Sequence, residues 1–416
     1  MSNADSQATT AGALPVQGLE TPCCIVGGGP AGMMLGLLLA RAGIEVVALE
    51  KHADFLRDFR GDTIHPSTLE VMWELGMLEG LLERPHQELR ALDGSLFGRR
   101  VRLADFSHLP THARFIALMP QWDFLDFIAT QAAKLPSFRL FMESEVTDLL
   151  YEGAAVAGVV VKTKQGARQV RAGLTVAADG RGSIVRERAA LSVTDYGAPI
   201  DVLWFRLSRR SADAQQPLGH VAGGRVLVLL ERGDYWQCAF VIPKGSFGDW
   251  QARGIDELKA GLAEIFPLPL ERLSELASWD QVKLLSVRVD RVDKWARPGL
   301  LLIGDAAHAM SPIGGVGINL AIQDAVAAAR ILTPALRSGR APSLDVLDRV
   351  QRRRELPTRL TQKIQLLVQN RFIGRTIQGG VEEVPWLARL LDRSALLRRL
   401  PARFVGLGLR PEHVST

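Results

Sequence analysis

The sequence contains little cysteine, and no spacing of cysteines that is typical of a metal site or a redox pair. Its 416 residues include Cys23, Cys24 and Cys238, and none of them lies in a CxxC arrangement. Cys23 and Cys24 are adjacent in an apolar, strand-like run, where successive side chains point to opposite faces. We therefore expect three buried thiols, and we predict neither thiol redox chemistry nor a metal site.

Long apolar runs and a signal sequence are also missing. The apolar run of residues 33–40 stops at Arg41, well short of the ~20 residues that a membrane-spanning helix needs. Residues 1–19 lack a basic region followed by an apolar one, so they read as a disordered lead and not as a signal peptide. We expect a cytoplasmic protein.

Positive charge is concentrated at the C-terminal end of the chain. The net charge is +5, yet residues 351–416 carry 13 Lys and Arg against five Asp and Glu. These basic residues are not interleaved with stacking aromatics, so nucleic acid is not an expected partner. A solvated basic face, or weak contact with a membrane surface or an acidic partner, remains open.

Strand and helix patterns alternate at both ends of the chain, and strands dominate its middle. Residues 21–50 read as a βαβ unit, and residues 191–285 as an antiparallel sheet interrupted by one helix. The remaining elements are expected helices at 65–82, 121–135, 255–266 and 317–338, a hairpin and strand at 158–179, and a strand at 300–303.

These patterns predict an α/β nucleotide domain that is assembled from separate segments, with a β-rich domain inserted. The expected divisions are a lead at 1–19, a nucleotide domain at 20–85, 110–190 and 286–345, a β-rich substrate domain at 86–109 and 191–285, and a helical C-terminal region at 346–416. We expect Pro357, Pro385 and Pro401 to break the helices of that last region.

The first motif is the glycine turn GGGPAG, directly after one strand and directly before a helix. Its glycines permit a tight turn, a close backbone approach to a pyrophosphate, and close packing of helix and strand. The helix N-terminus then offers N–H groups to the pyrophosphate. Glu50, at the end of the next strand, suits ribose hydroxyls, and Lys51 suits either a 2′-phosphate or the side of an adenine. The expected contacts in the turn are Gly27, Gly29, Pro30, Ala31 and Gly32.

The second motif is LLIGDAAHAMSPIGGVGIN, residues 301–319. A strand delivers Asp305 to its carboxyl end, where one carboxylate suits the hydroxyls of a polyol chain. Residues 317–319 open a long helix, whose N–H groups stabilise negative charge on a ring. No other GxGxxG follows a strand, so a second dinucleotide would have to visit without a fold of its own.

Three blocks together carry a family resemblance: GGGPAG with Glu50, VAADGRGSIVR (176–186) and GDAAHAMSPIGGVGIN (304–319). The sequence resembles the single-component flavoprotein aromatic hydroxylases, typified by para-hydroxybenzoate hydroxylase, over roughly residues 20–345. The resemblance implies a Rossmann-like FAD-binding domain, an inserted antiparallel β-sheet substrate domain and a helical C-terminal tail. It also implies bound FAD, transient NADH or NADPH, and O2, and hydroxylation of an aromatic or polycyclic apolar substrate through a flavin C4a-hydroperoxide.

The resemblance assigns further residues by position. Asp305 would hold the ribityl hydroxyls, Pro312 would lie beside the flavin, and Arg60 would reach the pyrophosphate. Capping of helices by the two aspartates and a surface ion pair for Arg60 are the alternatives. The additional FAD contacts that the resemblance implies are Arg60, Gln121, Val146, Asp179, Gly180, Gly304, Asp305, Pro312, Gly315, Gly317, Ile318 and Asn319.

Tyrosine is scarce, and this bears on the substrate. The resemblance places Ile200 where the para-hydroxybenzoate enzymes carry a phenol-activating tyrosine, and no carboxylate-binding arginine matches near Gly233. A larger or more apolar ring is therefore expected. Besides Pro312, the candidates for the substrate pocket are Trp204, Arg206, Tyr235 and Gln237.

Other functions stay open at this point. An FAD-dependent dehydrogenase, reductase or epoxidase of a lipid-like or quinone-like substrate would use the same scaffold, whereas nothing demands a non-catalytic flavin-binding protein. The C-terminal tail could cover the substrate opening, dock on a partner subunit or touch a membrane surface. A monomer and a homodimer are both compatible with the sequence.

Overall fold

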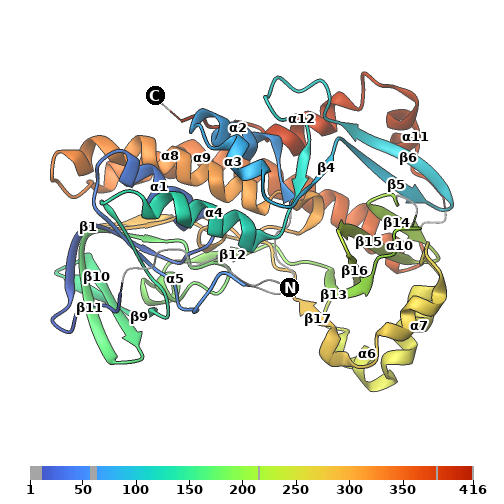
Figure 1. Ribbon diagram of the computed structural model, residues 1–416, viewed down its shortest axis with the longest axis horizontal. Helices are drawn as coiled ribbons and strands as arrows, with labels where there is room; N and C mark the ends of the chain where they lie inside the picture. Colours follow the sequence, from blue (N-terminus) through green and yellow to red (C-terminus); the bar gives the residue numbers. More distant parts are fainter. Residues whose placement is uncertain (1–11, 57–62, 214–215, 381–382, 415–416) are drawn as a thin grey trace.

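An eight-stranded sheet forms the centre of one half of the molecule (Figure 1). The computed structural model describes residues 12–56, 63–213, 216–380 and 383–414. Five strands of this sheet run parallel in the order β20-β11-β1-β2-β8, with β19 antiparallel at one edge and β10 and β9 extending β11. The strands are β1 (Leu19–Val26), β2 (Val46–Leu49), β8 (Phe138–Phe141), β9 (Glu145–Glu152), β10 (Ala155–Thr163), β11 (Gly166–Ala177), β19 (Ala296–Arg297) and β20 (Leu300–Leu302).

Helices pack beside this sheet and complete its core. Helix α1 (Pro30–Arg41) contacts both α4 (Gln121–Ala133) and α8 (Gly317–Arg337), and α8 lies alongside α9 (Leu344–Val368). Ten consecutive residues of α1 are buried, as expected for a helix that is apolar on every side. Residues 313–337 are apolar and long enough to cross a membrane, but 78% of an apolar 18-residue stretch within them is buried inside the protein. This segment is therefore a core helix.

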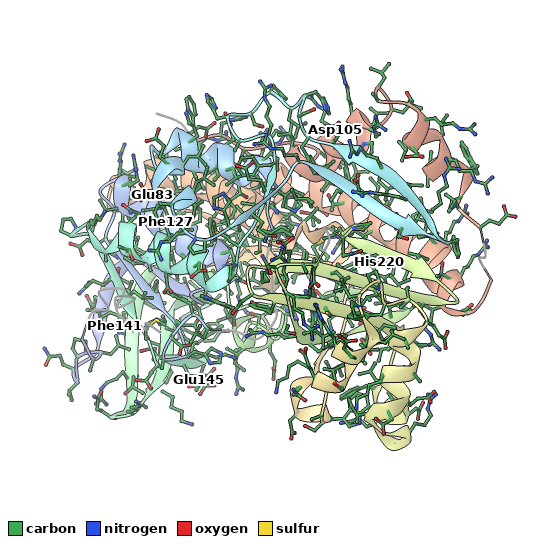
Figure 2. All side chains as sticks on the ribbon, turned by 45° about the vertical axis from the view of Figure 1, so that its right-hand side comes forward. Glu83, Asp105, Phe127, Phe141, Glu145 and His220 are labelled. Atoms are coloured by element: carbon green, nitrogen blue, oxygen red, sulfur yellow. The ribbon has the colours of Figure 1, made fainter. Side chains whose placement is uncertain are left out.

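A seven-stranded sheet forms the other half, in the order β17-β13-β16-β15-β14-β5-β6. One of its faces packs against α6 (Phe247–Arg253) and α7 (Ile255–Ala263) through a buried apolar cluster. Figure 2 labels His220 on this sheet, away from Phe141 and Glu145 of the eight-stranded one. The strands are β5 (Ala91–Leu96), β6 (Arg99–Asp105), β13 (Ile200–Ser208), β14 (Gly219–Ala222), β15 (Arg225–Arg232), β16 (Tyr235–Pro243) and β17 (Lys283–Leu285).

Short elements connect the two halves. A three-stranded sheet joins β3, β7 and β4, and β12 pairs with β18. These elements are β3 (Thr63–Ile64), β4 (Gln87–Leu89), β7 (Ile116–Leu118), β12 (Val193–Asp195), β18 (Asp290–Val292), α5 (Ile184–Arg188), and 3-10 turns at Leu270–Glu275, Trp279–Gln281, Gly304–Ala306 and Ile313–Gly315. The protein therefore has a mixed α/β fold with several sheets, as the sequence predicts.

A glycine divides one predicted helix, and another glycine separates a predicted helix from one that the sequence did not predict. Residues 65–82 form α2 (Pro66–Glu74) and α3 (Leu78–Leu82), because Gly76 adopts a φ of +71°. The single helix expected at 255–266 is preceded by α6, and Gly254 separates α6 from α7 with a φ of +90°. Glycine reaches these left-handed conformations without a Cβ penalty.

Two of the three expected proline breaks are wrong. The C-terminal region contains α9, a π-helical turn at Gln369–Ile373, α10 (Gly374–Ile377), α11 (Trp386–Arg393) and α12 (Arg399–Leu407). Pro357 is buried within α9, so packing outweighs the cost of its missing hydrogen bond. Pro401 lies in the first turn of α12, where an N–H has no partner within the helix. Only Pro385, directly before α11, marks a helix boundary.

The described part of the predicted disordered lead is ordered. Leu14 is buried in the main core, and the N–H of Gly18 donates to the carbonyl of Pro15 at 3.1 Å. The three cysteines are free and buried, as predicted, and burial raises the pKa of the Cys23 thiol to about 12.

Candidate functional site

The predicted motifs meet at one edge of the eight-stranded sheet. They follow β1, β2, β11 and β20 directly, and these strands are parallel. Carboxyl ends of parallel strands lie at the same edge, where α/β proteins bind their ligands. Segments nearly 300 residues apart in sequence therefore contribute to one site.

Two glycines of the turn after β1 leave no space for a side chain. Gly27 has a φ of +107°, and a Cβ there would lie 2.4 Å from the carbonyl oxygen of Ala178. At Gly32 a Cβ would lie 2.0 Å from the carbonyl oxygen of Gly27. Gly29 precedes α1, and Pro30 and Ala31 open that helix. The first N–H groups of α1 thus lie next to the glycine turn, whose backbone a ligand can approach closely.

Glu50 contacts the same turn from β2. Its carboxylate is nearly buried and accepts hydrogen bonds from the N–H of Gly28 at 2.8 Å and of His52 at 3.0 Å. Lys51 beside it is exposed. The carboxylate is therefore held at the sheet edge, within reach of a nucleotide bound on the turn.

The second glycine motif contacts the first. Gly304 has a φ of +60°, and a Cβ there would lie 3.1 Å from Cβ of Ala31 and 3.3 Å from Cβ of Ala321. Helices α1 and α8 pack closely at this point. The two glycine turns are therefore adjacent in space.

Asp305 forms an ion pair with a residue that sequence reasoning missed. Nε of Arg181 donates to its Oδ2 at 3.1 Å, and both side chains are partly exposed. Arg181 also reaches the carbonyl oxygen of Met310 at 3.5 Å. Its position directly after the Asp179–Gly180 pair was the only signal in the sequence.

Asp179 has one occupied and one unoccupied carboxylate oxygen. Its Oδ2 accepts a long hydrogen bond from the N–H of Val185 at 3.3 Å, which caps α5. Its Oδ1 is buried without a hydrogen-bond partner among the described residues, and burial raises the pKa of this carboxyl. Gly180 follows with a φ of +84° and open space around it. Asp179 could therefore cap α5 with Oδ2 and bind a ligand with Oδ1.

Arg186 ties the middle block to the second glycine motif. Its buried guanidinium donates to the carbonyl oxygen of Arg181 at 2.8 Å and lies 3.4 Å from both Oδ1 of Asp290 and the carbonyl oxygen of Ala306. This buried side chain and the Arg181–Asp305 pair together hold the two blocks in position.

The loop between Pro312 and α8 rests on the strand β3. Gly314 and Gly315 have φ values of +77° and +64°, and Thr63 Oγ1 donates to the carbonyl of Gly315 at 2.9 Å. The Asn319 side chain accepts from the N–H of His65 at 3.0 Å and from Thr68 at 2.7 Å. Its amide oxygen is therefore engaged by α2, while Gly317 and Ile318 open α8 at the loop's end.

A buried charge network supports the same loop. Nε2 of His308 lies 2.6 Å from Oδ2 of Asp324, whose other oxygen accepts from Nε of Arg354 at 2.9 Å. Asp324 also accepts from the N–H of Gly304 at 3.1 Å. Burial opposes ionisation, but His308 and Arg354 keep the pKa of Asp324 below its ordinary value.

The remaining predicted contacts are Gln121, Val146, Pro312 and Arg60. Gln121 begins α4, and Val146 is buried in the main core on β9. Pro312 immediately precedes the 3-10 turn at Ile313–Gly315. Arg60 lies outside the described residues. Among the described residues, the glycine turns, the N-terminus of α1 and the unpartnered oxygen of Asp179 fit a dinucleotide that carries hydroxyl groups.

The four candidate substrate residues share one face of the seven-stranded sheet. Arg206 pairs with Gln237 in register across β13 and β16, and alternation places Trp204 and Tyr235 on the same side. This face is opposite to the one that α6 and α7 cover. Gln237 is buried and near Arg232, whereas Arg206 is exposed with its guanidinium 4.8 Å from the Tyr235 ring centre.

An apolar cluster covers this face around Trp204. Trp204 packs there against residues of β6, β7, β15 and α12, and α12 lies over the cluster. Its buried members are Ala104, Phe106, Leu109, Ile116, Leu118, Leu230, Ala402 and Leu407. The C-terminal tail thus closes one side of the region between the two halves.

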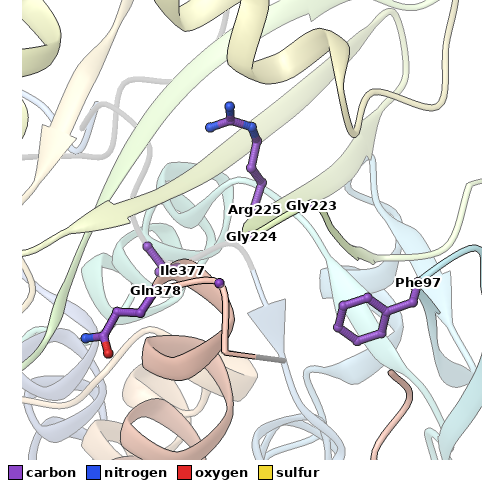
Figure 3. Close-up of a pocket in the computed structure, with 7 residues that line it drawn as sticks. Phe97, Gly223, Gly224, Arg225, Ile377 and Gln378 are labelled. Carbon is purple, nitrogen blue, oxygen red and sulfur yellow. The ribbon is translucent and has the colours of Figure 1, made fainter. Parts of the chain in front are cut away.

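An open cavity of about 570 Å³ lies elsewhere, between the β14–β15 turn and α10 (Figure 3). Phe97, Gly223, Gly224, Arg225 and Gln378 are among its lining residues. None of the motifs described above reaches it.

Comparison with known proteins agrees with the geometry. Residues 20–363 match the model of the FAD binding domain family. The chain is 33% identical over 391 residues to 6-methylpretetramide 4-monooxygenase of Streptomyces rimosus, covering 94% of this chain and 93% of that protein. It is 27% identical to dialkyldecalin synthase of Streptomyces rugosporus, covering 77% and 66%.

A solved structure shows the same fold. The p-nitrophenol 4-monooxygenase of Pseudomonas putida superposes with a TM-score of 0.73 at 20% identity, covering 93% of this chain and 97% of that one. The protein accordingly binds FAD and uses NAD(P)H as co-substrate. The chain belongs to the FAD binding domain family and is an FAD-dependent monooxygenase, as the resemblance implied.

Proposed function

We propose that this enzyme hydroxylates an aromatic or polycyclic apolar substrate. The substrate would be held between the FAD and the face of the seven-stranded sheet that carries Trp204 and Gln237. The FAD domain would be Rossmann-like and built from residues 20–85, 110–190 and 286–345. The substrate domain would comprise residues 86–109 and 191–285. The observation that carries the proposal is the contact between the two glycine turns at Ala31 and Gly304. The apolar side chains on one face of the seven-stranded sheet agree with an apolar substrate.

The cofactor contacts follow from the positions of the residues. The turn Gly27–Gly32 and the N-terminus of α1 would hold the pyrophosphate, and Glu50 the ribose. Asp305 would accept hydrogen bonds from the ribityl hydroxyls, with Arg181 beside it. Pro312 and residues 317–319 would border the ring.

The chain's own residues then provide orientation and exclusion of water. Bound FAD supplies the redox chemistry, with NAD(P)H and O2 as co-substrates. The apolar cluster around Trp204 would keep water from the reacting ring, and α12 would close that side. Gln237 offers a buried amide for a substrate hydroxyl or carbonyl, and Tyr235 and Arg206 would contact the outer part of a large substrate.

The test is a substrate screen with the purified, FAD-loaded protein. Phenols, quinolones, polyketides and quinone precursors are supplied with NADPH or NADH. A hit accelerates NAD(P)H oxidation in step with oxygen uptake and gives a product heavier by one oxygen. Turnover without oxygen would replace the hydroxylase with the dehydrogenase alternative. An oxygenated alkene instead of a ring would indicate an epoxidase.

We also propose weak contact between the basic C-terminal helices and an anionic membrane surface, from which an apolar substrate could enter. Trp386, Leu387 and Leu390 of α11 are exposed, and Arg393 and Arg399 beside them are exposed as well. Exposed apolar side chains flanked by arginines suit an anionic interface. We further propose a cytoplasmic location; a monomer and a homodimer are both compatible with this surface.

A further inference from the structure

Helix α9 carries polar residues on its buried face and apolar residues on its exposed face. Leu356, Leu360, Ile364 and Leu367 recur with helical spacing and are exposed. Leu347 and Val350 near the start of the helix are buried in the main core. From residue 354 onward, however, the buried side chains are mostly polar: Arg354, Thr358, Thr361, Gln362, Gln365 and, directly after α9, Gln369. A helix at a protein surface normally shows the reverse arrangement. The buried polar stripe therefore has partners that outweigh the loss of apolar burial.

Arg354 pairs with Asp324 and Glu412, and the three glutamines bind mainly the loop at 309–313. Nε2 of Gln362 donates to the carbonyl oxygens of Asp290 at 2.8 Å and of Ala309 at 3.0 Å. Four residues from Gln365, Oε1 of Gln369 accepts from the Ser311 hydroxyl at 2.8 Å. Each of these glutamines is almost completely buried.

Gln365 occupies the centre of this set and brackets Pro312. Its Nε2 donates to the carbonyl oxygen of Ser311 at 2.9 Å and to that of Ile313 at 2.8 Å. Proline has no N–H, so the loop presents acceptors here, and a side-chain amide carries the two protons that both carbonyls need. Removing the amide would leave two backbone acceptors without this donor.

We propose that Gln365, with Gln362 and Gln369 on either side, is a positioning residue that fixes Pro312 against the flavin ring. The inference rests on the proposed function, which places Pro312 beside that ring. Buried hydrogen bonds are costly to leave unmade, so the loop cannot shift without breaking several at once. The position of the ring edge would then be set by a helix outside the FAD motifs.

The experiment compares Gln365→Met with the wild-type protein, using FAD and NADPH as the probes. Methionine keeps an unbranched stem of similar volume but removes both donated hydrogen bonds. Asn370→Ala, an exposed carboxamide just after α9, is the matched control. FAD affinity, the visible absorption and reduction potential of the bound flavin, and NADPH oxidation in the absence of substrate are measured.

The expected result is that Gln365→Met still binds FAD, while the flavin spectrum and potential shift and NADPH oxidation falls on the order of tenfold. Asn370→Ala should match the wild type. If Gln365→Met is insoluble, Ser311→Ala is measured instead. It removes the bond to Gln369 and the long bond, 3.4 Å, that Oγ of Ser311 accepts from the N–H of Ile313, and it should shift the spectrum, potential and oxidation rate in the same direction by smaller amounts. Unchanged spectrum, potential and oxidation rate would overturn the inference, even if the variant melts earlier. A wild-type protein that fails to bind FAD would instead refute the proposed function.

Discussion

At the scale of single residues, Asp305 is the acidic group on which cofactor binding should depend most. It is the carboxylate that β20 delivers to the sheet edge, and its partner Arg181 lies beside the same site. A hydrogen bond to a charged group contributes about 1.5–3 kcal/mol. We therefore expect Asp305→Ala to weaken FAD binding roughly 10- to 100-fold.

The measurement for Asp305 is fluorescence titration of the apoprotein with FAD. Asp256→Ala is the control, because Asp256 is exposed and distant in the fold, on α7. Full retention of the cofactor by Asp305→Ala would contradict the assigned role. If Asp305→Ala unfolds at a lower temperature but binds FAD with unchanged affinity, the role of Asp305 is structural only.

Gly32 is a residue of the cofactor site at which one added methyl group should be strongly destabilising. A Cβ would lie 2.0 Å from the carbonyl oxygen of Gly27, so α1 would have to move away from the turn. Overpacking of this kind costs about 1–3 kcal/mol, and displacement of α1 should also weaken FAD binding. Thermal unfolding and FAD titration of Gly32→Ala measure both effects.

A second glycine provides the control for this prediction. Gly248 lies within α6, with open space where a Cβ would be. Because alanine is a better helix former than glycine, Gly248→Ala should leave the melting temperature unchanged or raise it slightly. Equal stability of the two variants would refute the steric argument.

At the scale of elements, the strands and turns of the site were predictable, and α9 was not. The glycine turns can be recognised from the local sequence, because Gly27 and Gly304 adopt φ values that favour glycine. Parallel strands then bring their carboxyl ends together whatever their separation in sequence. In α9, by contrast, the periodic leucines predict an inward face, and tertiary contacts of its polar residues with the loop at 309–313, Asp324 and Glu412 reverse it.

Residues that act through distant partners were missed for the same reason. Arg181 meets Asp305 across 124 positions, and Arg354 meets Glu412 across 58. No local pattern distinguishes the buried Arg354 from its exposed neighbour Arg352. Burial of a charge is decided by partners, which a single sequence does not display.

Arg354 is the residue through which α9 should contribute most to stability. It is almost fully buried between Asp324 of α8 and Glu412 near the C-terminus. Removal of one partner leaves buried charges uncompensated, which costs about 3–5 kcal/mol. We expect Arg354→Met to be destabilised by that amount in urea unfolding, and Arg352→Met, which breaks an exposed pair, by about 1 kcal/mol or less. Similar losses in the two variants would contradict the prediction.

His65 gives the packing of α2 against α12 a pH dependence. Its Nδ1 lies 2.7 Å from the carbonyl oxygen of Val405, and burial lowers its pKa to about 4 from 6.5, although that carbonyl favours the charged form. The folded state therefore holds neutral His65 while the unfolded chain takes up a proton. This stabilisation is complete above pH 6.5 and is lost as the pH falls toward 4, by roughly 3 kcal/mol.

Urea unfolding at pH 7.5 and pH 5 tests this dependence. Other groups titrate in the same range, so the informative quantity is the difference between the wild type and His65→Gln, which cannot take up the proton. We expect the variant to lose less stability than the wild type on acidification, and His108→Gln to behave as the wild type does. Parallel curves for all three proteins would disprove the assignment.

At the scale of the whole molecule, charge and exposed apolar area coincide on the C-terminal helices. Trp386 is 74% exposed, and Leu396 and Leu400 are each 68% exposed, while residues 351–416 hold an excess of eight positive charges. A second copy of the same surface would bring arginines against arginines, whereas an anionic bilayer complements both features. The charge pattern thus favours lipid over self-association.

Cosedimentation with vesicles decides between these two partners. We expect the protein to bind phosphatidylglycerol vesicles and not phosphatidylcholine vesicles, and to release them as salt rises, because the Debye length falls from about 10 Å at 0.1 M to about 3 Å at 1 M. The double variant Trp386→Ser/Leu390→Ser should lose binding, and Leu270→Ser, an exposed leucine outside this region, should retain it. Binding to neither vesicle, together with a dimer in sedimentation that the double variant abolishes, would reassign the surface to a subunit interface. In that case the apolar substrate would have to enter from solution, past α12.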